Sequence, residues 1–258
     1  MNDETNAPMA SETIRLLENR VSVRSYEDRP VPEETVNALL KAAFRAPTSS
    51  NIQAYSVITV RDQAIRDRLA DIAGGQAHVR KAPVFLAFCA DLTRVEAAIG
   101  KAGHDLGGVN LELGLIAAID TSLVGMAAYL AADSLGLKGV MIGGIRNDAV
   151  ETARALGLPK RVFCVFGLCL GFPADIPEQK PRMDFSQMVH CDRYGAPDGG
   201  PAPTEAIPDY DANLAAHYTS LGKQTVAGAW SEVIGAKFHP QPRPDLGSQL
   251  ADQGFDFD

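Results

Sequence analysis

The sequence predicts a mixed fold in which about four short strands alternate with helices. Short apolar runs, which are typical of buried strands, occur at 54–61, 84–90, 139–143 and 161–172. Helical periodicity appears in 31–46, and a longer apolar stretch covers about 106–135. Neither G-x-G-x-x-G nor G-x-x-x-x-G-K-S/T follows any of these strands. Rossmann and P-loop folds therefore lack their key element here.

The helices are predicted from their apolar spacing. In the segment 31–46 one face carries Val36, Leu39, Leu40, Ala43 and Phe44, and the first turn carries Pro32, Glu33 and Glu34. The stretch 106–135 is apolar nearly all round and is expected to be a central, buried helix. Further helices are expected at 209–221, at 225–236 and in the tail after 243. The tail is expected to pack on a partner subunit.

Composition excludes two classes of partner. The chain has 258 residues, 46% of them hydrophobic, and a net charge of -8. Duplex nucleic acid would be repelled by such a chain. No run reaches the roughly 18 uncharged apolar residues of a membrane span, and the N-terminus is acidic and polar, unlike a signal peptide. We expect a soluble, cytoplasmic protein that binds neither nucleic acid nor a membrane.

The four cysteines show no metal-binding or disulfide pattern. They are Cys89, Cys164, Cys169 and Cys191, and no pair has C-x-x-C spacing. Cys164 and Cys169 are five positions apart, so a regular strand would place them on opposite faces. We interpret the cysteines of the apolar runs as small buried hydrophobic residues in a reducing compartment.

Arg20, Ser22 and Arg24 alternate with Val21 and Val23. In an extended chain the two guanidiniums and the hydroxyl would share one face. Two cations held together repel each other unless an anion lies between them, so the segment is a candidate anion site. The alternative is a solvated face of an edge strand.

Three further stretches are candidate ligand contacts. Residues 46–53 offer hydroxyl groups and amides, including Thr48, Ser49 and Ser50, although a helix-to-strand connection has a similar composition. Gly74 and Gly75 precede Gln76, a weak signal because glycine ends many helices. Met141, Ile142, Gly143 and Gly144 end a buried strand, where backbone N–H groups can approach a planar ligand; a tight turn alone is equally compatible with them.

The segment 172–208 is rich in proline and glycine, and such long loops are usually functional or wrap a neighbour. Within it, Lys180 and Arg182 flank the rigid Pro181. Taken together, the four cations, the hydroxyl run, the amide and the glycine turn would suit a ligand with one phosphate and one flat heterocycle.

The order of these motifs resembles the oxygen-insensitive nitroreductases and FMN reductases. The motifs are "RVSVR", "PTSSNIQ", "GGQAHV", "GVMIGGIRN", "LCLGFPAD" and "KPR", and the resemblance extends from about Ile14 to Gly254. It implies an α+β fold with a central, mostly antiparallel sheet flanked by helices, in an intertwined homodimer with two FMN molecules at the interface. Residues 1–258 would form one FMN-binding domain, with an irregular excursion at 172–208 and a C-terminal helical extension at 209–258.

The resemblance also implies roles for residues. The flavin phosphate and pyrimidine edge would meet Arg20, Val21, Ser22, Val23 and Arg24, with Lys180, Pro181 and Arg182 completing the cationic site. Thr48, Ser49 and Ser50 would come from the second subunit, and Gln76 would contact the ring system or ribityl chain. One face of the ring would lie on Met141, Ile142, Gly143 and Gly144, with a glycine N–H near N5.

The implied activity is ping-pong transfer of two electrons from NADPH or NADH to nitroaromatics, quinones or related small molecules, with no catalytic side-chain acid or base. Two alternatives are a flavin reductase that supplies reduced FMN to a partner monooxygenase, and a flavin-binding module without turnover. The chain departs from the family pattern at Val21, which replaces an arginine, and at Leu221, which replaces the arginine that grips the NADPH phosphate. Lys223, two residues on, could substitute for that arginine, or NADH could be the donor.

Overall fold

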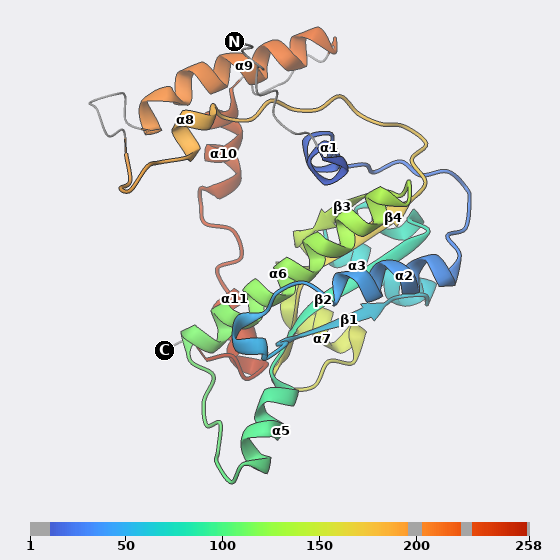
Figure 1. Ribbon diagram of the computed structural model, residues 1–258, viewed down its shortest axis with the longest axis vertical. Coiled ribbons are helices and arrows are strands. Elements are labelled where there is room, and N and C mark those ends of the chain that lie inside the picture. The colour runs from blue at the N-terminus through green and yellow to red at the C-terminus, as the bar shows by residue number, and fades with distance from the viewer. Residues whose placement is uncertain (1–10, 196–202, 223–228, 257–258) are drawn as a thin grey trace, which may run out of the picture. The chain divides into compact units, whose positions relative to one another are not determined.

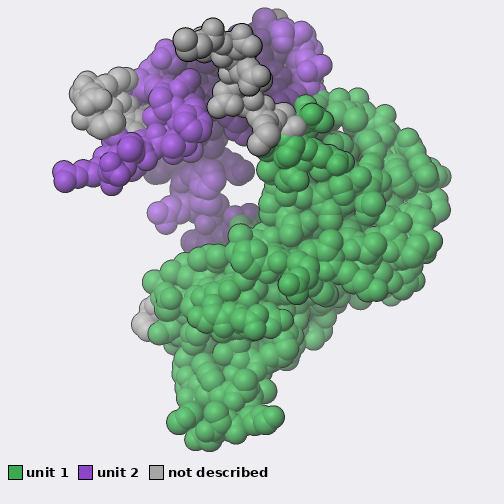
Figure 2. All heavy atoms as spheres, viewed as in Figure 1, with its two compact units in different colours: residues 1–177, 245–258 green, residues 178–244 purple. Residues whose placement is uncertain are grey.

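The computed structural model describes residues 11–195, 203–222 and 229–256. The chain forms two compact units, one comprising residues 1–177 with 245–258 and the other residues 178–244 (Figure 2). Each unit is built around its own set of contacts.

A four-stranded sheet forms the centre of the first unit (Figure 1). Its strands are β1 (Tyr55–Thr59), β2 (Val84–Asp91), β3 (Lys138–Ile142) and β4 (Val162–Gly171), in the order β1-β2-β4-β3. All three neighbouring pairs are antiparallel. The four predicted strands and the predicted antiparallel sheet flanked by helices are thus confirmed.

Helices cover both faces of this sheet. On one face lie α2 (Glu33–Ala43) and α6 (Leu111–Ser134), and their side chains join a core that includes Leu39, Phe88, Tyr129 and Leu168. The other face is covered by α3 (Gln63–Ile72), α4 (Ala77–Lys81) and α7 (Ala149–Leu156). Two more helices are α1 (Glu12–Glu18) and α5 (Thr93–Lys101).

Helix α6 is the predicted central helix, and it is the one described helix long and apolar enough to cross a membrane by length and composition. Its packing against α2, β2 and β4 accounts for the buried part of its apolar surface. The remaining apolar surface includes an exposed stripe at four-residue spacing, formed by Leu111, Leu115, Ile119 and Leu123. The expectation that the apolar helix is central and buried is therefore wrong for this side of α6.

A β-bulge overturns the expected placement of two cysteines. The pairing of β2 with β4 shifts register between Phe88 and Cys89, so that Val165 has no partner in the ladder. Because one extra residue reverses the alternation of side chains, Cys164 and Cys169 both pack into the core on the α3 face. Both thiols are buried and free, and burial raises the pKa of each.

The described part of the tail has contacts within its own unit. Helix α11 (Leu246–Asp252) belongs to the first unit, and the N–H of Arg161 donates to the carbonyl of Gln253 at 2.8 Å. Phe255 is fully buried, with its ring 4.7 Å from that of Phe163. The expected packing of the tail on a partner subunit stays a prediction.

The second unit is helical. It contains α8 (Phe185–Met188), the 3-10 turn η3 (Pro203–Ala206), α9 (Ile207–Ser220) and α10 (Trp230–Phe238). Helices α9 and α10 are joined by a ring contact between Tyr210 and Trp230 and by two hydrogen bonds from Ser231 to Asp211. The two predicted helices are confirmed, although residues 225–228 of the second lie outside the described residues.

Candidate functional site

The segment 20–24 lies against the start of strand β3. Ser22 forms a parallel bridge with Gly139, and the N–H of Val23 donates to the Gly139 carbonyl at 2.9 Å. Val21 and Val23 are buried, whereas Arg24 is exposed. The alternation expected from the sequence is therefore present, at one edge of the sheet.

Tyr129 of α6 holds this segment in place through a hydrogen bond to its backbone. Its hydroxyl donates to the carbonyl of Val21 at 2.5 Å and lies 3.3 Å from the carbonyl of Gly139. The Arg20 guanidinium carbon is 5.6 Å from the centre of the Tyr129 ring, and Arg20 Nη1 is 3.4 Å from Ser22 Oγ. Burial raises the pKa of Tyr129 against the opposing effect of Arg20, so the phenol keeps its proton and remains a donor. Sequence reasoning missed Tyr129, although a hydroxyl in an otherwise apolar helix is a usable signal.

The turn after β3 packs against the segment that carries Gln76. A β-carbon on Gly144 would lie 3.0 Å from the Ala73 carbonyl oxygen, so glycine is needed for this close approach. Gln76 Nε2 donates to the same carbonyl at 2.8 Å. Met141 is 39% exposed, whereas the Ile142 side chain lies in the core, so only the main chain of Ile142 is available to a ligand.

Arg24 and helix α4 are electrostatic neighbours. Burial lowers the pKa of His78, and the charge of Arg24 lowers it further. Burial is the main cause that raises the pKa of the Tyr26 phenol, and the charge of Arg24 opposes this rise. His78 is therefore neutral near pH 7. The first unit thus gathers Arg20–Arg24, the turn at 141–144 and Gln76 around strand β3.

The loop 46–53, which carries Thr48, Ser49 and Ser50, is held by a different residue of α6, Asp120. It contains the 3-10 turn η1 (Ser49–Asn51), and three of its residues have positive φ: Ser50 (46°), Asn51 (58°) and Gln53 (52°). The carboxylate of Asp120 accepts the N–H groups of Ser49 at 2.9 Å and Ala54 at 3.2 Å. Asp120 is nine positions before Tyr129, which is about 13 Å along a helix. The structure therefore anchors this loop well away from the anchor of segment 20–24.

Lys180, Pro181 and Arg182 belong to the second unit. The Lys180 ammonium is 5.3 Å from the Tyr218 ring, and the Tyr210 hydroxyl donates to the Pro181 carbonyl at 3.1 Å. Arg182 Nη1 lies 3.4 Å from the carbonyls of both preceding residues. The convergence of these cations with Arg20 and Arg24 stays a prediction.

Leu221, the position expected to replace an NADPH-binding arginine, lies at the end of α9. Leu221 follows this helix, and its N–H donates to the Tyr218 carbonyl at 3.2 Å. Lys223, which was considered as a substitute cation, lies outside the described residues.

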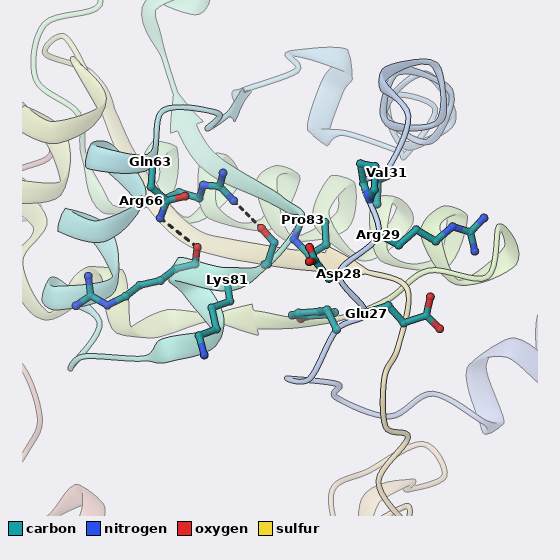
Figure 3. A pocket seen from close by; sticks show the side chains of 12 residues that line it. Glu27, Asp28, Arg29, Val31, Gln63, Arg66, Lys81 and Pro83 are labelled. Carbon is teal, nitrogen blue, oxygen red and sulfur yellow. Dashed lines mark hydrogen bonds between the residues drawn. The ribbon is translucent and has the colours of Figure 1, made fainter.

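A separate hollow of about 610 Å³ lies beside the segment that follows Arg24 (Figure 3). Figure 3 shows Arg66 of α3 among the lining side chains, and it donates to the Ala82 carbonyl at 2.6 Å. The walls mix cations such as Lys81 with the carboxylates Glu27 and Asp28. None of the predicted flavin-binding residues lines this hollow.

Family models match nearly the whole chain. The model of the nitroreductase family matches residues 17–172, and that of the nitroreductase family, C-terminal domain, matches residues 180–258. The antiparallel fold and the motif-bearing loops around β3 agree with these matches. The chain belongs to the nitroreductase family.

Curated relatives and solved structures resemble the chain along its length. It is 38% identical over 250 residues to the oxygen-insensitive NADPH nitroreductase of Salmonella typhimurium, covering 95% of this chain and 98% of that protein. It is 34% identical to the FMN reductase [NAD(P)H] of Bacillus subtilis, with coverage of 95% and 98%. Among solved structures, the NADPH:FMN oxidoreductase of Vibrio harveyi complexed with NAD+ superposes with a TM-score of 0.84 at 33% identity, covering 95% of this chain and 99% of that one.

Proposed function

We propose that this protein is an FMN-dependent oxidoreductase that transfers two electrons from NADPH or NADH to nitroaromatics, quinones or related acceptors in a ping-pong cycle. The observation that carries the proposal is the gathering of Arg20–Arg24, the glycine turn and Gln76 around strand β3 in a member of the nitroreductase family. Relatives named for NADPH-dependent nitro reduction and for FMN reduction support the same chemistry.

The residues around β3 fit a flavin mononucleotide. A phosphomonoester is close to dianionic at neutral pH, and charge-assisted bonds to arginine are about twice as strong as neutral ones. Arg24 is exposed and Arg20 half-buried on one face, and the turn that contains Gly143 follows the same strand. Lys180 and Arg182, on either side of Pro181, would complete the phosphate site. Bound FMN would supply the two-electron chemistry, and the chain would bind and orient it.

We further propose a cytoplasmic homodimer in which each chain is one functional domain spanning residues 1–258, with the excursion at 172–208 and the extension at 209–258. The exposed stripe formed by Leu111, Leu115, Ile119 and Leu123 is the apolar surface that such a dimer would cover. Thr48, Ser49 and Ser50 would then reach the flavin of the partner. Asp120 and Tyr129 hold the 48–50 loop and segment 20–24 at well-separated positions along α6. This separation supports the assignment of the loop and the segment to different flavins.

The second candidate function is a flavin reductase that supplies reduced FMN to a partner monooxygenase. It is favoured by the relatives named FMN reductase and NADPH-flavin oxidoreductase, each 34% identical to this chain. It uses the same site and differs in the electron acceptor, which would be free flavin.

An acceptor panel tests both functions. The purified protein is expected to bind one FMN per chain and to oxidise NADPH or NADH with nitrofurazone or a quinone as acceptor. Turnover with free FMN alone would favour the flavin reductase. A protein that takes up no FMN would exclude both functions, and one that binds FMN without oxidising either donor would be a flavin-binding module.

Donor selectivity is expected to depend on Lys223. The Lys223→Ala variant should lose turnover with NADPH several-fold while keeping turnover with NADH, because only NADPH carries the extra phosphate that a point charge would attract. Steady-state rates with both donors measure this effect, with Lys237→Ala in α10 as the matched control. An equal loss with the two donors would refute this role of Lys223.

A further inference from the structure

Asp120 is a buried carboxylate in the middle of an apolar helix. Its side chain is 0% exposed, and no ion pair involves it among the residues that the structure describes. A buried carboxylate is costly unless its oxygens are hydrogen-bonded. Both oxygens are used here, and both accept backbone N–H groups of the loop that follows α2.

The two accepted N–H groups bracket a strained loop. Ser49 and Ala54 stand on either side of Ser50, Asn51 and Gln53, the three residues of this loop that have positive φ. Such conformations persist only where the surroundings enforce them. Asp120 therefore fixes both ends of the strained stretch, and a neutral apolar residue at this position would leave two backbone donors without a partner.

From this geometry we propose that Asp120 is a positioning residue for the flavin site. It acts through the loop and does not touch the ligand: by holding the N–H groups of Ser49 and Ala54, it presents the side chains at 48–50 in one conformation. Ser49 and Ser50 are exposed and so remain available to a neighbouring molecule. The inference rests on the proposed function, in which this loop completes the FMN site of the partner chain.

Asp120→Asn is the sharpest variant. The amide keeps one acceptor oxygen but turns an NH2 group toward the second backbone N–H, so one of the two bonds is lost without a change in side-chain size. Thr121→Val is the matched control, because Thr121 is also 0% exposed in α6 and its hydroxyl bonds only Ala117 of the same helix.

We expect Asp120→Asn to raise the dissociation constant for FMN about 10-fold, the loss of one charge-assisted hydrogen bond. The visible circular dichroism of bound FMN should change as well. Thr121→Val should lower the melting temperature of the apoprotein while leaving the FMN affinity and the flavin spectrum as in the wild type. A merely structural role for Asp120 would change stability in the same way as Thr121→Val and would leave the flavin spectrum untouched.

Hydrogen exchange on the wild-type protein keeps the test independent of how the variant folds. The amides of Ser49 and Ala54 are expected to exchange slowly, and exchange at the rate of a free loop would overturn the proposal. Wild-type protein that binds FMN, together with an Asp120→Asn variant of equal affinity and spectrum, would overturn the role of Asp120 alone. Wild-type protein that binds no FMN would instead overturn the proposed function.

Discussion

Arg24→Ala is expected to weaken FMN binding about 10- to 100-fold, because a hydrogen bond to a charged group contributes about 1.5–3 kcal/mol and each 1.4 kcal/mol is tenfold. Arg24 is exposed on the segment beside β3, while buried Val21 and Val23 hold the backbone in place. The substitution therefore removes charge from the proposed phosphate site without opening the core. Titration of the apoprotein with FMN, followed by flavin fluorescence, measures the change.

Two variants control for this effect. Arg29→Ala removes a neighbouring cation that stacks on the Phe172 ring, 3.7 Å from its centre, and should leave FMN affinity unchanged. Arg24→Lys should recover part of the lost affinity, since a lysine keeps the charge but not the planar pair of donors. If the Arg24→Ala variant binds FMN as tightly as the wild type, the phosphate does not lie at this segment.

Gly139→Ala is expected to destabilise the fold by at least about 3 kcal/mol, the upper end of the cost of overpacking. A β-carbon at this position would overlap the backbone carbonyl oxygen of Cys169 and lie 2.7 Å from Leu170 Cδ2. A backbone atom of β4, which is paired on both sides, cannot move aside as the end of a flexible side chain can. Because the Gly139 carbonyl also accepts the N–H of Val23, the same change should loosen segment 20–24 and weaken FMN binding.

Gly100→Ala in α5 is the matched control for stability. No atom lies within 4 Å of a β-carbon placed there, and alanine in a helix is favoured over glycine by roughly 0.5–1 kcal/mol. Chemical denaturation of the two apoprotein variants compares them directly. A Gly139→Ala variant as stable as Gly100→Ala would show that the approach of β3 to β4 is looser than described.

The sheet could be predicted because its strands are almost wholly apolar. β2 and β4 are buried along nearly their whole length, so their composition alone marks them. Helix α6 was predictable for the same reason. Its exposed stripe was not, because an apolar residue such as Leu115 or Ile119 does not itself indicate whether it faces the sheet or a partner. The short helix α3 was missed, although its N-cap residue Asp62 was a readable signal.

The remaining errors concern contacts between distant parts of the sequence. The bulge opposite Cys89 depends on the pairing of two strands, and no local pattern marks Val165 as the extra residue. The burial of Phe255 depends on an edge-on ring contact with Phe163, a distant residue in the sequence. For the proposed site, the sequence indicated candidate ligand-facing residues. The roles of Asp120 and Tyr129, which hold the loops that carry those candidates, became visible through bonds to Ala54 and Val21, distant residues in the sequence.

The central claim is that one flavin is shared between the cations of one chain and the 48–50 loop of another, and mixed dimers test it most directly. An Arg24→Ala chain and an Asp120→Asn chain, carrying different affinity tags, would be combined and the mixed dimer isolated. In this dimer one site would join intact cations to an intact loop, while the other would lack both. We therefore predict one tight FMN site per mixed dimer, although neither variant alone has any. A mixed dimer in which both sites stay weak would contradict the claim, because each chain would then be using its own loop.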